Sequence, residues 1–133
     1  MNQILVPTSP GELVDKLTIL RLKSENIKDQ GKLHNVQQEL STLQALADEH
    51  LPKSDLLDRL WLKLYGINCD LWVIEDDIRA CESRSDFGPA FIALARAVYV
   101  TNDERAAIKR EINILLDSPL IEEKSYHPTA SDA

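Results

Sequence analysis

The sequence predicts an all-α fold, an antiparallel helical bundle in which a shorter N-terminal helical hairpin packs on a long central helical hairpin. Apolar residues recur at alternating steps of three and four over long stretches, as in helices that pack along a shared seam. Ser9 and Ser54 suit the caps of two such helices. The stretches are separated at Gly31, at Pro52 and at Ser83-Arg84-Ser85, where the chain is expected to turn.

The N-terminal hairpin is expected to contain two helices of similar length. Ser9 suits the N-cap of the first helix, over residues 10–28, with proline at its first position and Glu12 at its third. Gly31 is expected to mark the break before a second helix over residues 32–49. Because the connection is short, the two helices should be antiparallel neighbours.

The third helix begins after Ser54 and is the longest predicted element. About 30 residues at ~1.5 Å each make a rod of roughly 45 Å, whereas each helix of the N-terminal hairpin spans only ~28 Å. That hairpin cannot cover both faces of the rod, so part of the long hairpin is expected to stay exposed or to pair with a second copy. The seam positions of the third helix keep heptad spacing throughout: Leu57, Leu60, Leu64, Ile67, Leu71, Ile74, Ile78 and Cys81.

The fourth helix is expected to start after a cap at Asp86 and to end near Asp117. Its seam series keeps the same phase on both sides of two polar interruptions, Thr101 and Arg105. Thr101 also opens a sequence that matches a capping box, so a helix break is the alternative. The preserved phase favours one continuous or kinked helix, because a loop has no reason to maintain it.

Shorter segments flank the helices. Residues 3–7 are expected to form an extended lead-in or to pack on the helices. Residues 120–126 follow Pro119 and are expected to dock on the bundle, and residues 127–133 lack anchoring side chains and are expected to be mobile. Residues 1–126 are therefore predicted to form a single helical domain.

Composition narrows the classes of function. The 133 residues include 22 acidic and 15 basic side chains, so the net charge of −7 argues against nucleic acid and anionic membranes as partners. The chain has no signal-peptide pattern and no apolar run long enough to span a membrane. Cys69 and Cys81 are expected to be reduced thiols, so a cytoplasmic location is predicted.

No motif indicates a cofactor or a metal site. The sequence has no glycine-rich phosphate loop, no nucleophile elbow and no Cys/His spacing typical of zinc. We therefore expect neither a nucleophilic triad nor zinc-dependent hydrolysis. The sequence does not decide whether the protein is an enzyme.

The polar interruption of the seam is the first candidate site. Antiparallel pairing places Asn68 level with Asn102, and Gly66 level with Arg105. Gly66 costs ~1 kcal/mol in a helix interior, and a close backbone approach or room for the Arg105 side chain would explain it. A buried guanidinium needs a carboxylate or a ring of carbonyls within reach, and three acidic residues are candidates: Asp70, Asp103 and Glu75.

Two interpretations of this polar layer stay open. It is either a register device, as a polar seam residue is in coiled coils, or an anion-binding pocket in which Arg105 acts with Arg96 and Lys109 beside Asn68. The neighbouring segment with Glu75, Asp76 and Arg79 is interpreted as a salt-bridged surface. The alternative for the acidic residues is a magnesium cluster that also includes Glu12 and Asp15.

Four spaced motifs resemble a bacterial family of small uncharacterised proteins catalogued as a domain of unknown function. The motifs are Ser9-x-Gly11-Glu12-Leu13-x-Asp15-Lys16-Leu17-Thr18-Ile19-Leu20, Leu71-Trp72-x-Ile74-Glu75-Asp76-x-Ile78-Arg79, Asn102-Asp103-x-Arg105-Ala106-x-Ile108-Lys109-Arg110 and Glu122-Glu123-Lys124-Ser125-Tyr126. The resemblance implies a bacterial, cytoplasmic protein without an assigned activity. It draws attention to the polar residues inside or beside the motifs, Lys124 among them.

These observations favour a helical interaction or assembly module that forms a homodimer or binds a protein partner. The alternative is a small enzyme or sensor that binds a phosphate- or carboxylate-bearing ligand at the polar layer, and magnesium-dependent nucleotide hydrolysis is less favoured. No metal site is predicted. The candidate ligand-binding residues are Asn68, Glu75, Asp76, Arg79, Arg96, Asn102, Asp103, Arg105, Lys109 and Lys124.

Overall fold

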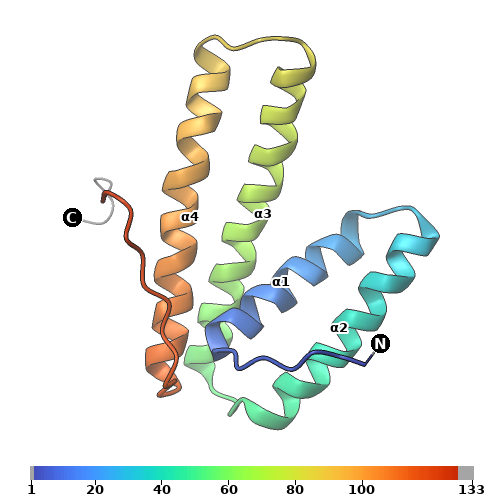
Figure 1. The fold of residues 1–133 in the computed structure, drawn as a ribbon, viewed down its shortest axis with the longest axis vertical. Coiled ribbons are helices and arrows are strands. Elements are labelled where there is room, and N and C mark those ends of the chain that lie inside the picture. Colours follow the sequence, from blue (N-terminus) through green and yellow to red (C-terminus); the bar gives the residue numbers. More distant parts are fainter. Residues whose placement is uncertain (1, 129–133) are drawn as a thin grey trace.

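The computed structural model describes residues 2–128, which form four α-helices and no strand. Two antiparallel hairpins build the fold, and the second is the longer, which confirms the predicted architecture (Figure 1). The helices are α1 (Pro10–Asn26), α2 (Gln30–His50), α3 (Asp55–Ser83) and α4 (Pro89–Leu115). No helix among the described residues is long and apolar enough to cross a membrane.

The N-terminal hairpin has the predicted cap on its first helix but not the predicted break before its second. The Ser9 hydroxyl accepts a hydrogen bond from the Glu12 backbone N–H at 3.2 Å, and a proline occupies the first position of α1. The α2 helix begins earlier than predicted, because the Asp29 side chain caps it. Gly31 therefore lies inside the first turn of α2, and the prediction that it marks the break was wrong.

The central hairpin is continuous on both sides of its turn. Ser54 caps α3 by accepting from the Leu57 N–H at 3.1 Å. Asp86 does not cap α4 but accepts from the Gly88 N–H at 3.1 Å within the turn, so α4 starts later than predicted. The α4 helix runs without interruption through Thr101, which confirms the continuous helix over the capping-box alternative.

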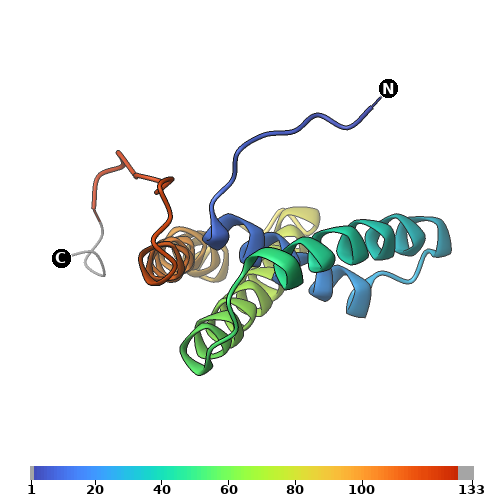
Figure 2. The same cartoon turned by 90° about the horizontal axis from the view of Figure 1, so that it is seen from below.

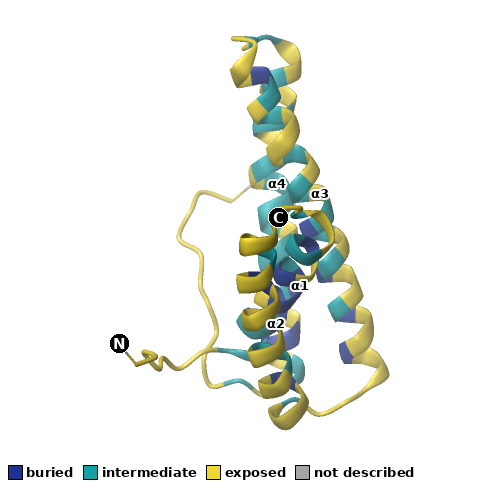
Figure 3. Ribbon diagram, turned by 90° about the vertical axis from the view of Figure 1, so that its right-hand side faces the viewer, coloured by how far each residue is buried: buried dark blue, intermediate teal, exposed yellow. Residues whose placement is uncertain are grey.

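The core lies where α1 crosses the lower half of the central hairpin. Gly11 allows this crossing, because a Cβ there would overlap the Lys109 carbonyl oxygen of α4. Figure 3 shows the buried residues gathered in this region. The α2 helix packs on α1 alone among the described helices. The buried apolar cluster is formed by Val14, Leu57, Leu60, Leu64, Ile108 and Ile112.

The upper half of the central hairpin extends beyond α1 and α2 (Figure 1). Among the described residues from 69 to 107, only Cys81 is buried, and the seam is otherwise half-exposed. Exposed apolar side chains such as Val73 and Ile92 lie along these helices. The expectation that the shorter hairpin leaves part of the rod uncovered is thus confirmed.

The N-terminal segment extends away from the helices, as Figure 2 shows. Residues 2–9 have no regular secondary structure, and Ile4, Leu5 and Val6 are largely exposed, so the extended lead-in is the correct alternative. Both cysteines are free thiols. The predicted mobile tail over residues 127–133 falls mostly outside the described residues.

Candidate functional site

A buried polar centre joins α1 to both helices of the central hairpin. We use this name for Asp15, Thr18, Asn68 and Arg105. The Asp15 carboxylate is 1% exposed and accepts two bonds from Arg105, from Nε at 2.9 Å and from Nη2. Asn68 Nδ2 donates to Asp15 Oδ1 and to Thr18 Oγ1, at 2.9 Å each. No fully enclosed side-chain nitrogen or oxygen of the described residues lacks a hydrogen-bond partner.

Asp15 is the acidic partner of Arg105, so the prediction of Asp70, Asp103 or Glu75 was wrong. The physical reason is that α1 crosses the seam at the height of Arg105 and inserts Asp15 between the long helices. The register between α3 and α4 does not predict where α1 crosses them.

The ion pair changes the pKa of Arg105. The hydrogen bond from Arg105 to Asp15 raises the pKa of the guanidinium above its ordinary value, and burial opposes this shift without overcoming it. A buried charge without its partner is costly, so the pair specifies where α1 docks on the hairpin. This arrangement supports the interpretation of the polar layer as a register device.

Lys109 lies one turn from Arg105 and binds a different set of carboxylates. Its ammonium group is 2.9 Å from Glu12, 3.1 Å from Glu122 and 4.0 Å from Asp15. Burial lowers the pKa of Lys109, but the bonds to Glu12 and Glu122 outweigh it and raise the pKa above 10.5. Lys109 therefore ties the start of α1 and the C-terminal segment to α4.

The C-terminal segment lies along α4 and is held by charge. It docks as predicted, although Tyr126 is 81% exposed and adds little packing. Three consecutive residues each form an ion pair with α4: Glu122 with Lys109, Glu123 with Arg110 at 2.9 Å, and Lys124 with Asp103.

A groove of about 540 Å³ lies above the polar centre, between α1 and the central hairpin. Its apolar wall comes from Ile19, Leu22, Leu71 and Trp72. Arg105 reaches the groove with the part of its guanidinium that Asp15 does not engage, because 28% of its side chain is exposed. Six of the residues predicted from the sequence line this groove: Asn68, Glu75, Asp76, Arg79, Asn102 and Arg105.

The other predicted residues lie elsewhere. Lys109, Asp103 and Lys124 belong to the ion pairs with the C-terminal segment. Arg96 is exposed and lies nine positions from Arg105, roughly 13 Å along the helix, so the two do not form the predicted pocket together. Gly66 is also exposed, and a Cβ there would meet nothing within 4 Å, so Gly66 does not make room for Arg105 as predicted.

Three of the four acidic residues of the magnesium alternative are engaged with cations. Arg105 binds Asp15, Lys109 binds Glu12, and Arg79 Nε lies 3.3 Å from Glu75 in an exposed pair. Within residues 2–128, no group of three or more histidine, cysteine or acidic side chains is placed to hold a metal ion. The structure therefore does not form the cluster that this alternative requires.

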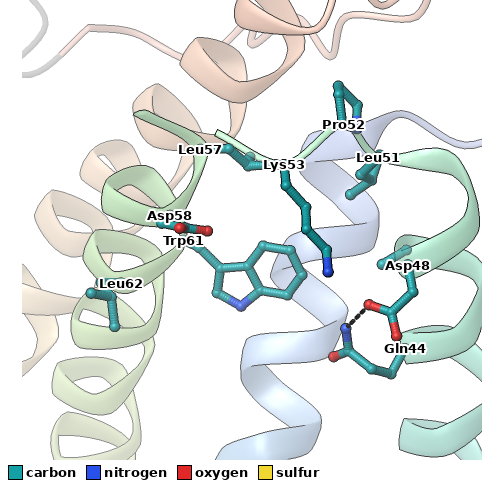
Figure 4. A pocket seen from close by; sticks show the side chains of 10 residues that line it. Gln44, Asp48, Leu51, Pro52, Lys53, Leu57, Asp58, Trp61 and Leu62 are labelled. Carbon is teal, nitrogen blue, oxygen red and sulfur yellow. Dashed lines mark hydrogen bonds between the residues drawn. The ribbon is translucent and has the colours of Figure 1, made fainter. Parts of the chain in front are cut away.

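A second hollow, of about 590 Å³, lies between the end of α2 and the start of α3. Figure 4 shows the Trp61 indole standing in it and the Lys53 side chain pointing into it, above a hydrogen bond of 2.9 Å from Gln44 to Asp48. None of the residues predicted as ligand-binding lines this hollow.

Sequence reasoning missed the contribution of α1 to the polar centre. Gly11, Asp15, Thr18 and Leu22 are spaced by four, three and four residues, which places them on one helical face. The Gly11 N–H donates to Asn113 Oδ1 of α4 at 2.7 Å, and Thr18 is fully buried. The available signal was Asp15 and Thr18, two polar side chains at helical spacing on a face that also has Gly11 and Leu22.

Comparison with known proteins identifies one family. A family model described as "Family of unknown function (DUF6165)" matches residues 4–133. No curated protein and no solved structure matches the chain. The matched range includes the polar centre, the groove and the docked C-terminal segment.

Proposed function

We propose that this chain, which belongs to the family of unknown function, is a non-enzymatic helical assembly module. In this proposal the chain pairs with a second copy of itself. One observation carries the proposal: α1 covers one flank of the central hairpin, and no other helix among residues 2–128 covers the opposite flank. The charged groups of the polar centre neutralise one another, which favours a structural role for them over catalysis.

Helical spacing defines the bare flank. Asn68 and Trp72 of α3, and Lys109 and Asn113 of α4, face α1 or the groove, so the positions on the other side of each seam face away from α1. We call this set the open face. Its small and apolar members are Gly66, Val73 and Ala80 of α3 and Ala93, Ala97, Val100, Ala107 and Ile114 of α4.

The size of the open face matches that of a stable dimer interface. The 29 residues of α3 extend roughly 43 Å, and two helices side by side are roughly 20 Å wide, so the face covers roughly 850 Å². Stable interfaces bury about 800 Å² per partner. Since the upper hairpin alone supplies only about half of this area, we propose that the whole face is used.

The charges on the open face are compatible with a dimer whose two-fold axis runs parallel to the helices of the hairpin. Such an axis places α3 of one protomer against α4 of its partner at equal height. Arg59 and Lys63 lie on the lower part of α3, and Glu104 and Glu111 lie on α4. Counting from the turn between Ser83 and Pro89 places Lys63 level with the stretch between the two glutamates. Basic side chains of each α3 would then meet acidic side chains of the partner's α4. A Cβ at Gly66 would meet no described atom within 4 Å, so this glycine is open to a partner and would allow close approach of the helices.

Sedimentation equilibrium tests this proposal with two matched variants. Val73 on the open face is 56% exposed, and Ile92, on the flank toward α1, is 55% exposed. The native chain of 15.0 kDa is expected to sediment as a dimer at micromolar concentration. Val73→Glu should shift it to monomer, and Ile92→Glu should not. A native monomer at about 100 µM, or equal effects of both variants, would contradict the proposal.

A further inference from the structure

We propose that the groove above the polar centre binds a small elongated zwitterion, an aminoalkyl carboxylate with an apolar stem. The groove lies on the flank toward α1, whereas the open face lies on the other flank, so the site is independent of the assembly proposed above. Different side chains of the groove recognise the two ends of the ligand and set its length.

The carboxylate end is recognised by Arg105 and Asn102. Asp15 occupies Nε and Nη2 of Arg105, and Nη1 makes only a long contact of 3.5 Å with Asn102 Oδ1. Asn102 Nδ2 donates to no residue that the structure describes. Two donors, Arg105 Nη1 and Asn102 Nδ2, are therefore available to a carboxylate from the groove.

A buried acceptor lies beside these donors. Asn68 is 5% exposed, and its Nδ2 donates to Asp15 and Thr18. Asn68 Oδ1 accepts no bond from the described residues, and every fully enclosed side-chain oxygen among them has a partner. The Oδ1 atom must therefore be accessible, and the groove that Asn68 lines gives that access. A polar ligand atom or its bound water would satisfy this acceptor.

The amine end is recognised by Asp76. Asp15 offsets the charge of Arg105, and Glu75 offsets that of Arg79, in a pair whose side chains are 51% and 80% exposed. Asp76 forms no ion pair with any residue described in the structure and leaves the groove with one net negative charge. A simple anion is thus disfavoured, and a ligand with an ammonium group near Asp76 is favoured.

The distance between the two ends selects the ligand length. Counting from the turn, Asn102 lies level with residue 70 of α3, and Asp76 lies six residues further, or roughly 9 Å along the helix. Side-chain reach shortens this to roughly 5–8 Å, too long for an α-amino acid and suited to a stem of about five methylenes. Trp72, Leu71 and Ile19 provide an apolar wall for that stem.

The test is isothermal titration calorimetry of the full chain with 6-aminohexanoate, followed by NMR of the tryptophan indole N–H groups. Glycine has both charges without the stem, hexanoate lacks the amine, and hexylamine lacks the carboxylate. We expect 6-aminohexanoate to bind and to shift the Trp72 signal, and each comparison compound to bind at least about tenfold more weakly.

Two exposed neighbours on α3 provide the matched variants. Asp76→Asn removes the proposed ammonium partner and should weaken binding about tenfold. Asp77→Asn changes the next residue, on the other flank, and should leave the affinity unchanged. Absence of 6-aminohexanoate binding, equal binding of hexanoate, or full affinity in Asp76→Asn would each overturn the proposal. Sedimentation of the same samples reports on assembly separately.

Discussion

Replacing Arg105 by leucine should be among the most destabilising single changes in this chain. The substitution leaves the Asp15 carboxylate, 1% exposed, without the guanidinium that binds both of its oxygens. Removing one partner of a buried ion pair typically costs 3–5 kcal/mol. Lys109, 4.0 Å from Asp15, compensates in part, so we expect a loss of about 3 kcal/mol.

The companion change Asp15→Asn should cost less. The asparagine keeps the shape and an acceptor for Asn68, and the orphaned guanidinium of Arg105 is 28% exposed and reaches solvent. We expect a loss of about 1–2 kcal/mol. The double variant Asp15→Asn/Arg105→Leu buries no lone charge, so it should be more stable than Arg105→Leu alone.

Urea unfolding monitored by circular dichroism measures these differences at constant protein concentration. In thermal unfolding, a loss of about 3 kcal/mol in the free energy of unfolding corresponds to a decrease of roughly 11 °C in Tm for a chain of 133 residues. Arg110→Leu is the control. Arg110 is also on α4 and is paired with Glu123 of the C-terminal segment, but its side chain is 47% exposed, so the change should alter stability by less than about 0.5 kcal/mol. A double variant whose loss equals the sum of the two single losses would refute the reasoning.

The remaining predictions concern two glycines and one tyrosine. Gly11→Ala should destabilise the chain by about 1–3 kcal/mol in urea unfolding, because its Cβ would overlap the backbone of α4. Gly66→Ala, at an open position, should stabilise dilute protein by up to about 1 kcal/mol, and a loss there would contradict the helical account. The hydrogen bond of 2.5 Å from Tyr65 to Glu25 raises the pKa of Tyr65 from 10.0 to about 12. The unfolded chain therefore releases this proton first, so the unfolding free energy should fall between pH 10 and pH 12, and Tyr65→Phe should reduce that fall.

Heptad spacing predicted the central hairpin because the residues at its seam repeat at a fixed spacing along each helix. The seam keeps one phase through Thr101, and the structure keeps one helix there. The same periodicity placed Asn68, Asn102 and Arg105 at similar heights, and all three line the groove. A regular helix converts residue spacing into position, which is why this part of the candidate site was predictable.

The partner of Arg105 was not predictable in this way. Asp15 comes from α1, and the angle at which α1 crosses the hairpin depends on a close approach at Gly11 that periodicity does not encode. Arg96 is on the same helix as Arg105 but lies roughly 13 Å away along it. Their closeness in sequence therefore did not place both side chains at one pocket. Gly66 was assigned to a contact inside the chain that does not exist.

The attachment of α2 to α1 alone implies a hierarchy of local stability. When α1 detaches from the central hairpin, α2 still packs on α1, its one neighbour among the described helices. Because an isolated pair of short helices is only marginally stable, the amide protons of α2 should exchange at about the free energy of the α1 docking step. The core segments of α3 and α4 remain paired with each other in such an opened state. Native-state hydrogen exchange should therefore resolve two cooperative units, with the N-terminal hairpin opening first and the Asp15–Arg105 pair controlling the free-energy gap between them.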